Sequence, residues 1–182
     1  INTNWKFLIE NFIEPYHVQF VHKTTTNQPL KDHYTIVDGI CYGSGVDVNE
    51  EDNKNSNALS VTSRYLSLFP NFIIGSYFPN QIGVYLNVPI SPSETTQKRI
   101  IYTTDGKNMS KQESNIVKKI WWNVHKEDHE MCERLQEGRS SPASTQGGLL
   151  SPHWEKGVQA FQKLIIESTM KRSRNMKGKK NV

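Results

Sequence analysis

Two histidines five residues apart, His17 and His22, lie in an opening stretch where most other side chains are apolar or aromatic. An acid, Glu14, precedes the first histidine by three positions. Burying an imidazole or a carboxylate among apolar side chains costs free energy unless a partner compensates it. Because imidazole is the most frequent protein ligand of transition metals, this spacing points to a metal site that needs a further ligand.

A third ligand is predicted on a helix in the second half of the chain. Ser110 and Glu113 have the spacing of a capping box, and Gly138 is the predicted stop. At about 100° per residue, Asp128 falls within the apolar stripe of this helix and Glu127 at its edge, so Asp128 should point toward the core. The stripe comprises Ile116, Val117, Ile120, Val124, Met131 and Leu135.

Two histidines and one inward carboxylate form the ligand set that holds ferrous iron in oxygenases, where open coordination positions admit dioxygen and substrate. Spacing alone leaves other interpretations open. His17 and His22 could be hydrogen-bonded histidines of the core or of a helix end. Asp128 could instead pair with Arg134 or Lys126. Zinc hydrolases use similar ligands, but the sequence lacks the HExxH signature.

The elements that carry the histidines must bring them together. The spacing of apolar residues predicts a helix from about Trp5, with Asn4 as its N-cap. Pro15 should interrupt it, which predicts a separate short helix from His17 to His22. On an ideal helix, side chains five residues apart point roughly 140° apart. The histidines can therefore converge only where the helix is distorted or ends between them.

Residues 34–105 change to short runs rich in Val, Ile, Tyr and Phe, broken by Gly, Pro, Asn and Ser, which predicts an antiparallel sheet. Gly39, Gly43 and Gly45 suggest β-bulges that would curve the sheet. Residues 49–57 are predicted to form an exposed loop, and His153 to Met170 a final amphipathic helix. The predicted strands are 34–48, 59–69, 72–78, 83–88 and 99–104.

The 182 residues should form one domain, 1–170, followed by a basic, disordered tail, 171–182. The tail holds six lysines and arginines and no acid, so the body carries about −2 despite a net charge of +4, which argues against nucleic-acid binding. Two distant cysteines and the lack of a membrane-length apolar run predict a cytoplasmic protein with no membrane partner. The start at Ile1, directly on the motif, suggests a larger protein that has lost its N-terminal part.

Two ordered motifs resemble the signatures of the Rieske non-haem iron oxygenases, the family of ring-hydroxylating dioxygenase large subunits and related demethylases. The resemblance extends from Asn4 to about Thr169. It implies an α+β helix-grip (START/Bet v 1-like) catalytic domain, in which a curved antiparallel sheet packs around a long helix. The motifs are Asn4-Trp5-Lys6, Glu10-Asn11 and Glu14-x-Tyr16-His17-x4-His22, and then Glu127-Asp128-x3-Cys132-Glu133-x2-Gln136-x-Gly138-x2-Ser141.

The resemblance implies roles for individual residues. The positions of His17, His22 and Asp128 match the ligands of Fe(II). Glu14 matches the carboxylate that links this iron to the Rieske cluster of a neighbouring subunit. The resemblance also implies catalytic roles for Asn11 and Tyr16, near the site, although Tyr16 could serve only in packing.

The family's Rieske domain, which holds a two-iron two-sulfur cluster, has no counterpart in this sequence. The resemblance therefore implies a fragment that is inactive alone. The expected partners are a homotrimer or hexamer of subunits, a reductase or ferredoxin, dioxygen and a small-molecule substrate. The substrate would be an aromatic ring or an N-methyl or quaternary amine. Glu14 stands where many ring dioxygenases have Asp, which resembles the members that act on carnitine or glycine betaine. The alternative is a non-enzymatic helix-grip protein that binds an apolar ligand.

Overall fold

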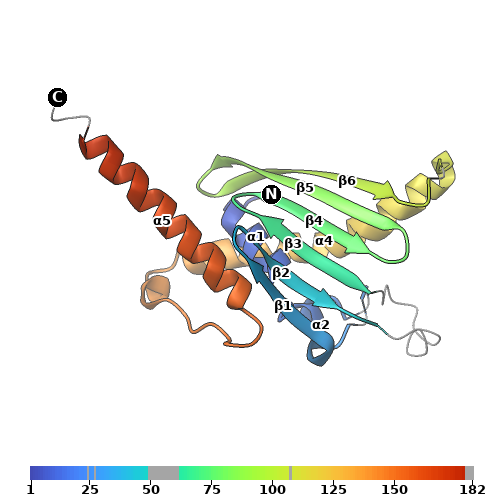
Figure 1. The fold of residues 1–182 in the computed structure, drawn as a ribbon, viewed down its shortest axis with the longest axis horizontal. Helices are drawn as coiled ribbons and strands as arrows, with labels where there is room; N and C mark the ends of the chain where they lie inside the picture. Colours follow the sequence, from blue (N-terminus) through green and yellow to red (C-terminus); the bar gives the residue numbers. More distant parts are fainter. Residues whose placement is uncertain (24, 27, 49–61, 107, 179–182) are drawn as a thin grey trace.

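The computed structural model describes residues 1–182 except 24, 27, 49–61, 107 and 179–182. Its centre is a six-stranded antiparallel sheet in which each strand pairs with the next one along the chain (Figure 1). The strands are β1 (His33–Asp38), β2 (Cys41–Val46), β3 (Ser63–Leu68), β4 (Phe72–Tyr77), β5 (Gln81–Ser91) and β6 (Glu94–Thr103). The predicted loop 49–57 lies outside the described residues.

The predicted strand 34–48 is wrong as a single element, because it divides into β1 and β2 around a tight turn. Asp38 pairs with Cys41, and Gly39 between them has φ 57°, a left-handed conformation that glycine adopts at little cost. The predicted bulges at Gly43 and Gly45 are also wrong, since β2 pairs in regular register on both sides. A Cβ at Gly43 would lie 1.8 Å from the Tyr65 carbonyl oxygen, so this glycine permits close strand approach.

The first two helices confirm the predicted interruption at Pro15. Helix α1 (Trp5–Ile13) has Asn4 as its N-cap, whose side chain accepts a hydrogen bond from the Lys6 amide at 3.1 Å. Glu14 is its C-cap, and α2 (Val18–Val21) is a separate single turn. A short 3₁₀ helix, η1 (Leu30–Asp32), then leads into β1.

The long helix α4 (Lys111–Arg139) begins at the predicted capping box. The Ser110 amide donates to Glu113 at 2.8 Å, and the Glu113 amide donates to Ser110 Oγ at 3.2 Å. The predicted stop at Gly138 is one residue early, because the helix ends at Arg139 and Ser140 caps it. The 3₁₀ helix η2 (Pro142–Gln146) follows.

The last helix, α5 (Lys156–Gly178), begins three residues later than predicted and continues past Met170. The backbone of the segment set apart as a tail is therefore helical as far as Gly178, and residues 179–182 lie outside the described residues. The division of the chain at residue 170 stays a prediction. Among the described residues, none of the helices combines the length and the apolar character that crossing a bilayer requires.

The helices pack against one face of the sheet. Alternate residues of β4, Ile73 and Tyr77, are buried on this face. Figure 1 shows α4 passing behind the strands, while α5 packs beside β1 and β2 and projects beyond the sheet. This arrangement confirms the predicted α+β class. The main core cluster contains Ile9, Ile13, Tyr42, Ile73, Tyr85, Val158 and Phe161.

Candidate metal centre

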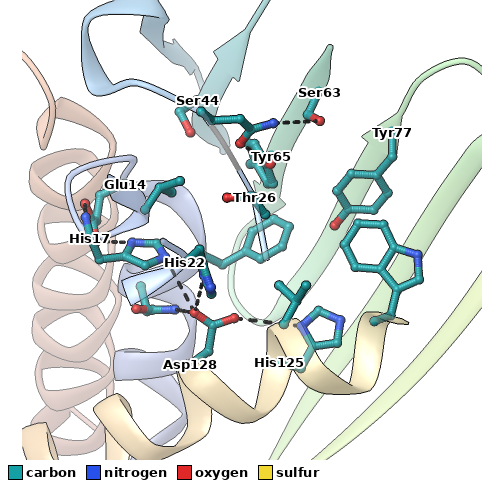
Figure 2. A pocket seen from close by; sticks show the side chains of 16 residues that line it. Glu14, His17, His22, Thr26, Ser44, Ser63, Tyr65, Tyr77, His125 and Asp128 are labelled. Carbon is teal, nitrogen blue, oxygen red and sulfur yellow. Dashed lines mark hydrogen bonds and ion pairs between the residues drawn. The ribbon is translucent and has the colours of Figure 1, made fainter. Parts of the chain in front are cut away.

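Three side chains from α4 and the ends of α2 converge on one point. The nearest ligand atoms of His17, His22 and Asp128 all lie within 4.8 Å of one another. Nε2 of His17 is 3.5 Å from Asp128 Oδ1, and Nε2 of His22 is 3.0 Å from the same oxygen. Figure 2 shows both imidazoles directed toward Asp128 at the edge of a pocket. The structure therefore brings together the three residues that the sequence predicted as ligands.

The two histidines converge because they flank one helical turn instead of sharing a longer helix. His17 is the N-cap and His22 the C-cap of α2. The amide of His22 still donates to the Val18 carbonyl at 3.0 Å, but the backbone of His22 has φ −93° and ψ 37°, outside the helical region. The two ring centroids are 5.3 Å apart. Helix α2 thus ends between the two histidines, as helix geometry requires if their side chains are to converge.

A carboxylate contacts the Nδ1 atom of each imidazole. Glu14 Oε1 lies 2.6 Å from Nδ1 of His17, and Glu127 Oε2 lies 2.7 Å from Nδ1 of His22. Thr25 Oγ1 also donates to Glu127, at 2.7 Å. Metal-binding histidines usually donate their second N–H to a carboxylate, which fixes the tautomer and the ring orientation. This leaves both Nε2 atoms for a cation, so the donor set fits a divalent metal.

Two further side chains contact the Asp128 carboxylate. Asn11 Nδ2 donates to Asp128 Oδ1 at 2.9 Å, while the other carboxylate oxygen lies 3.8 Å from His125 Nδ1. The side chain of Asp128 is 15% exposed, which agrees with the inward direction predicted from helix phase. The structure places the Asn11 amide against the Asp128 carboxylate, and the catalytic role predicted for Asn11 stays a prediction.

The N-terminal segment ties α1 to α4 and so sets the distance between the histidines and Asp128. Thr3 Oγ1 donates to the Cys132 carbonyl at 2.9 Å. The amide of Asn2 donates to Glu133 Oε1, and that of Asn4 to Gln136 Oε1, each at 2.9 Å. Cys132, Glu133 and Gln136 are the residues that follow Asp128 in the second motif. Through these hydrogen bonds they hold the segment that leads into the first motif against α4.

Two predicted site residues differ in exposure. Glu14 is 13% exposed, and its Oε2 accepts hydrogen bonds from the backbone amides of Tyr16 and His17. Tyr16 is 48% exposed, and its ring lies 5.8 Å from that of Phe20 instead of lining the pocket. Tyr16 thus contacts Glu14 through its backbone amide, and the catalytic role predicted for its side chain stays a prediction.

The pocket beside Asp128 has a volume of ≈ 50 Å³ and is lined by helices and by strands β2, β3 and β4 (Figure 2). Sequence reasoning missed His125, which is buried and has no hydrogen-bond partner at Nε2. Its position three residues before Asp128, on the same helix face, was the available signal. Aromatic rings form much of the wall: Phe12, Tyr65, Tyr77 and Trp121.

The pKa values of the ligands reflect the density of charge around them. Burial favours neutral His17, but the Glu14 and Asp128 carboxylates outweigh it and raise its pKa to about 10. Burial lowers the pKa of His22, but the hydrogen bond to Asp128 and the charge of that carboxylate outweigh it, so the pKa is raised. Burial would raise the pKa of Asp128, yet the hydrogen bonds from both histidines hold it well below its usual range. Without a cation, the centre is therefore a compact cluster of ion pairs.

Binding of Fe²⁺ is expected to release a proton and to tighten about tenfold per pH unit between about pH 6.5 and 8.5, because a ligating imidazole must be neutral. The raised pKa of His17 also stabilises the metal-free fold below pH 6.5, and this contribution is lost as the pH rises toward about 10. Anaerobic calorimetry in two buffers of different ionisation enthalpy measures the proton release. Thermal unfolding of metal-free protein across this range measures the stability. An affinity that does not change with pH would contradict the assigned pKa of His17.

Comparisons with known proteins agree with this geometry. The family model described as the ring hydroxylating alpha subunit (catalytic domain) matches residues 1–169. The chloroplastic choline monooxygenase of Atriplex hortensis is 29% identical over 162 residues, which are 88% of this chain and 36% of that protein. The chain thus spans little more than a third of this relative.

Solved structures share the fold. CntA, a quaternary ammonium Rieske monooxygenase solved with an inhibitor, has a TM-score of 0.70 at 17% identity, over 90% of this chain and 46% of that one. Another CntA structure contains its substrate γ-butyrobetaine. Dicamba monooxygenase has a TM-score of 0.66 at 13% identity, over 95% of this chain and 58% of that one. These likenesses confirm the predicted helix-grip fold.

Proposed function

The chain belongs to the ring hydroxylating alpha subunit family, and from this premise we propose that it is the catalytic domain of a Rieske-type oxygenase with Fe(II) at His17, His22 and Asp128. The observation that carries the proposal is the meeting of these three side chains, from two separate motifs, within 4.8 Å. The carboxylates at both Nδ1 atoms support it further, because they orient the imidazoles for a cation.

Each residue has a distinct task in this proposal. The two Nε2 atoms and the Asp128 carboxylate would hold Fe(II), which supplies dioxygen activation when bound. Asn11 keeps the Asp128 carboxylate in place through its hydrogen bond. The aromatic wall formed by residues such as Tyr77 and Trp121 limits water beside the metal. An apolar ligand without a metal is a weaker interpretation, since it would make no use of the two oriented imidazoles and the carboxylate that meet at one point.

Glu14 is proposed to connect the site to an electron donor. It contacts Nδ1 of His17 on one side and retains 13% exposure on the other. The solved structure of CntA is described as revealing inter-subunit electron transfer. By analogy, a neighbouring subunit's Rieske cluster would approach Glu14 in an oligomer, with a reductase or ferredoxin as the earlier donor. The exposed Tyr16 and Phe20 rings beside it would contribute to that contact.

A quaternary amine is the proposed substrate class. The relatives by sequence are choline monooxygenases, and CntA is a quaternary ammonium monooxygenase. The pocket walls offer aromatic faces, which attract such cations. Hydroxylation of an N-methyl carbon or its neighbour is therefore the expected reaction.

Electron paramagnetic resonance of the protein with Fe²⁺ and nitric oxide tests this proposal. Nitric oxide occupies the open positions of a ferrous site held by three protein ligands and gives a characteristic high-spin signal. We expect one signal per chain, and a change in its shape when a quaternary amine is added. Failure of the folded protein to bind about one equivalent of Fe²⁺ would refute the assignment.

A further inference from the structure

A second charged position lies outside the metal centre, at Arg99 on β6. Its guanidinium carbon lies 5.3 Å from the centre of the Tyr85 ring. Its Nε donates to Gln97 Oε1, and its Nη2 lies 3.0 Å from Nε2 of His129 on α4. Gln97 in turn donates through Nε2 to Asn87 Oδ1 at 2.5 Å, which leaves its carbonyl oxygen directed at Arg99. These contacts hold the guanidinium between the sheet and α4.

None of these partners of Arg99 is an acid, so none of them offsets the positive charge of the guanidinium. In the part of the chain that the structure describes, no ion pair joins Arg99 to an acid, whereas Arg64 pairs with Asp47 at 2.7 Å. A guanidinium has more N–H donors than the two that these contacts use. A partly buried arginine thus retains donors and an uncompensated charge.

Arg99 lines an open groove of ≈ 740 Å³ between β6 and α4. Among the described lining residues there are two more cations, Lys118 and Lys119, and no acid. Trp121 and His125 line both this groove and the metal pocket. The two hollows are therefore neighbours that share part of one wall.

The two hollows have opposite electrostatic character. The metal pocket is walled largely by the faces of aromatic rings, which attract a quaternary amine. The groove has Arg99 and lysines, and Arg is the side chain best shaped to bind a carboxylate through two N–H groups. We propose that Arg99 binds the carboxylate of a zwitterionic substrate whose quaternary amine lies in the metal pocket. This inference rests on the proposed function and narrows its substrate class to amines that carry a carboxylate.

Calorimetric binding of two probes at low ionic strength tests the assignment. γ-Butyrobetaine has both a quaternary amine and a carboxylate, whereas choline has the amine and a hydroxyl. The wild type is expected to bind γ-butyrobetaine at least about 10-fold more tightly than choline, as charge-assisted hydrogen bonds require. Arg99→Gln should lower γ-butyrobetaine affinity about 10- to 100-fold, while choline affinity changes less than about twofold. Arg99→Lys should restore part of the preference, because it retains the charge.

Lys98→Gln is the matched control, since Lys98 is exposed and neighbours Arg99 on the same strand with its side chain on the other face. It should leave both affinities within about twofold. An equal loss for both probes in Arg99→Gln would indicate a merely structural role and overturn the inference. If Arg99→Gln does not fold, the comparison of the two probes on the wild type is the test, and similar affinities for γ-butyrobetaine and choline overturn the inference. If the protein binds no Fe²⁺ but still prefers γ-butyrobetaine, and Arg99→Gln removes that preference, the proposed function is refuted and the inference about Arg99 stands.

Discussion

Replacement of Asp128 by alanine is expected to lower the affinity for Fe²⁺ by more than about 100-fold. Even residues that only orient metal ligands contribute about 10- to 100-fold to affinity, and Asp128 supplies the single carboxylate among the three proposed ligands. Its loss also leaves His17 and His22 without the acid that both contact. Anaerobic titration with Fe²⁺, followed by the nitric oxide signal, measures the change.

Glu130→Ala is the control for this prediction. Glu130 lies two residues further along α4, is exposed, and contacts Lys126 at 3.8 Å instead of the metal pocket. Its replacement should change the Fe²⁺ affinity less than about twofold. Circular dichroism shows whether each variant is folded. If folded Asp128→Ala binds Fe²⁺ as tightly as the control, the proposed ligand set is wrong.

Replacement of Phe161 by alanine is expected to lower the free energy of unfolding by about 3–5 kcal/mol, the usual range for a fully buried aromatic side chain. Phe161 on α5 has 0% exposure, and its ring lies 5.9 Å from Trp5 of α1 and 5.6 Å from Tyr42 of β2. The truncation would leave a cavity where α1, α5 and the sheet meet. Urea unfolding followed by circular dichroism measures the difference.

Phe20→Ala removes the same atoms at an exposed position and serves as the comparison. Phe20 is 56% exposed and packs mainly against Tyr16. Its replacement should cost less than about 1 kcal/mol. Equal losses in the two variants would show that α5 contributes little to the core.

The part of the site that could be predicted from the sequence is the part set by regular helix geometry. Asp128 points inward because α4 is a continuous helix that begins at the capping box of Ser110 and Glu113. The need for a break between His17 and His22 also followed from helix geometry. The family membership extends these predictions to ligand roles, which stay proposals until iron binding is measured.

Other features depend on contacts between distant segments, which a single sequence does not display. Glu127 looked like an edge residue of the helix stripe, but it meets His22 because α2 packs against α4. Gly43 suggested a bulge, whereas its lack of a side chain permits the close approach of Tyr65. The division of β1 from β2 had a local signal in the Asp38-Gly39 dipeptide, which favours hairpin turns.

The extension of α5 beyond Met170 depends on local helix propensity and not on contacts between distant segments. The basic composition of residues 171–182 predicts disorder, but lysine, arginine and methionine all have high helix propensity. Positive charges also interact favourably with the C-terminal end of a helix dipole. Intrinsic propensity and the helix dipole therefore account for a helical backbone where composition alone predicts disorder.

The contact between His22 and Glu127 spans 105 positions along the chain, and that between Asn11 and Asp128 spans 117. The whole meander from β1 to β6 lies between these residues. Closing so long a loop is entropically costly, and contacts of this range form late in folding. Because carboxylates already hold both imidazoles, the site needs no ion to assemble. The proposed iron is therefore expected to enter an already folded protein, and a chelator is expected to remove it without unfolding the chain.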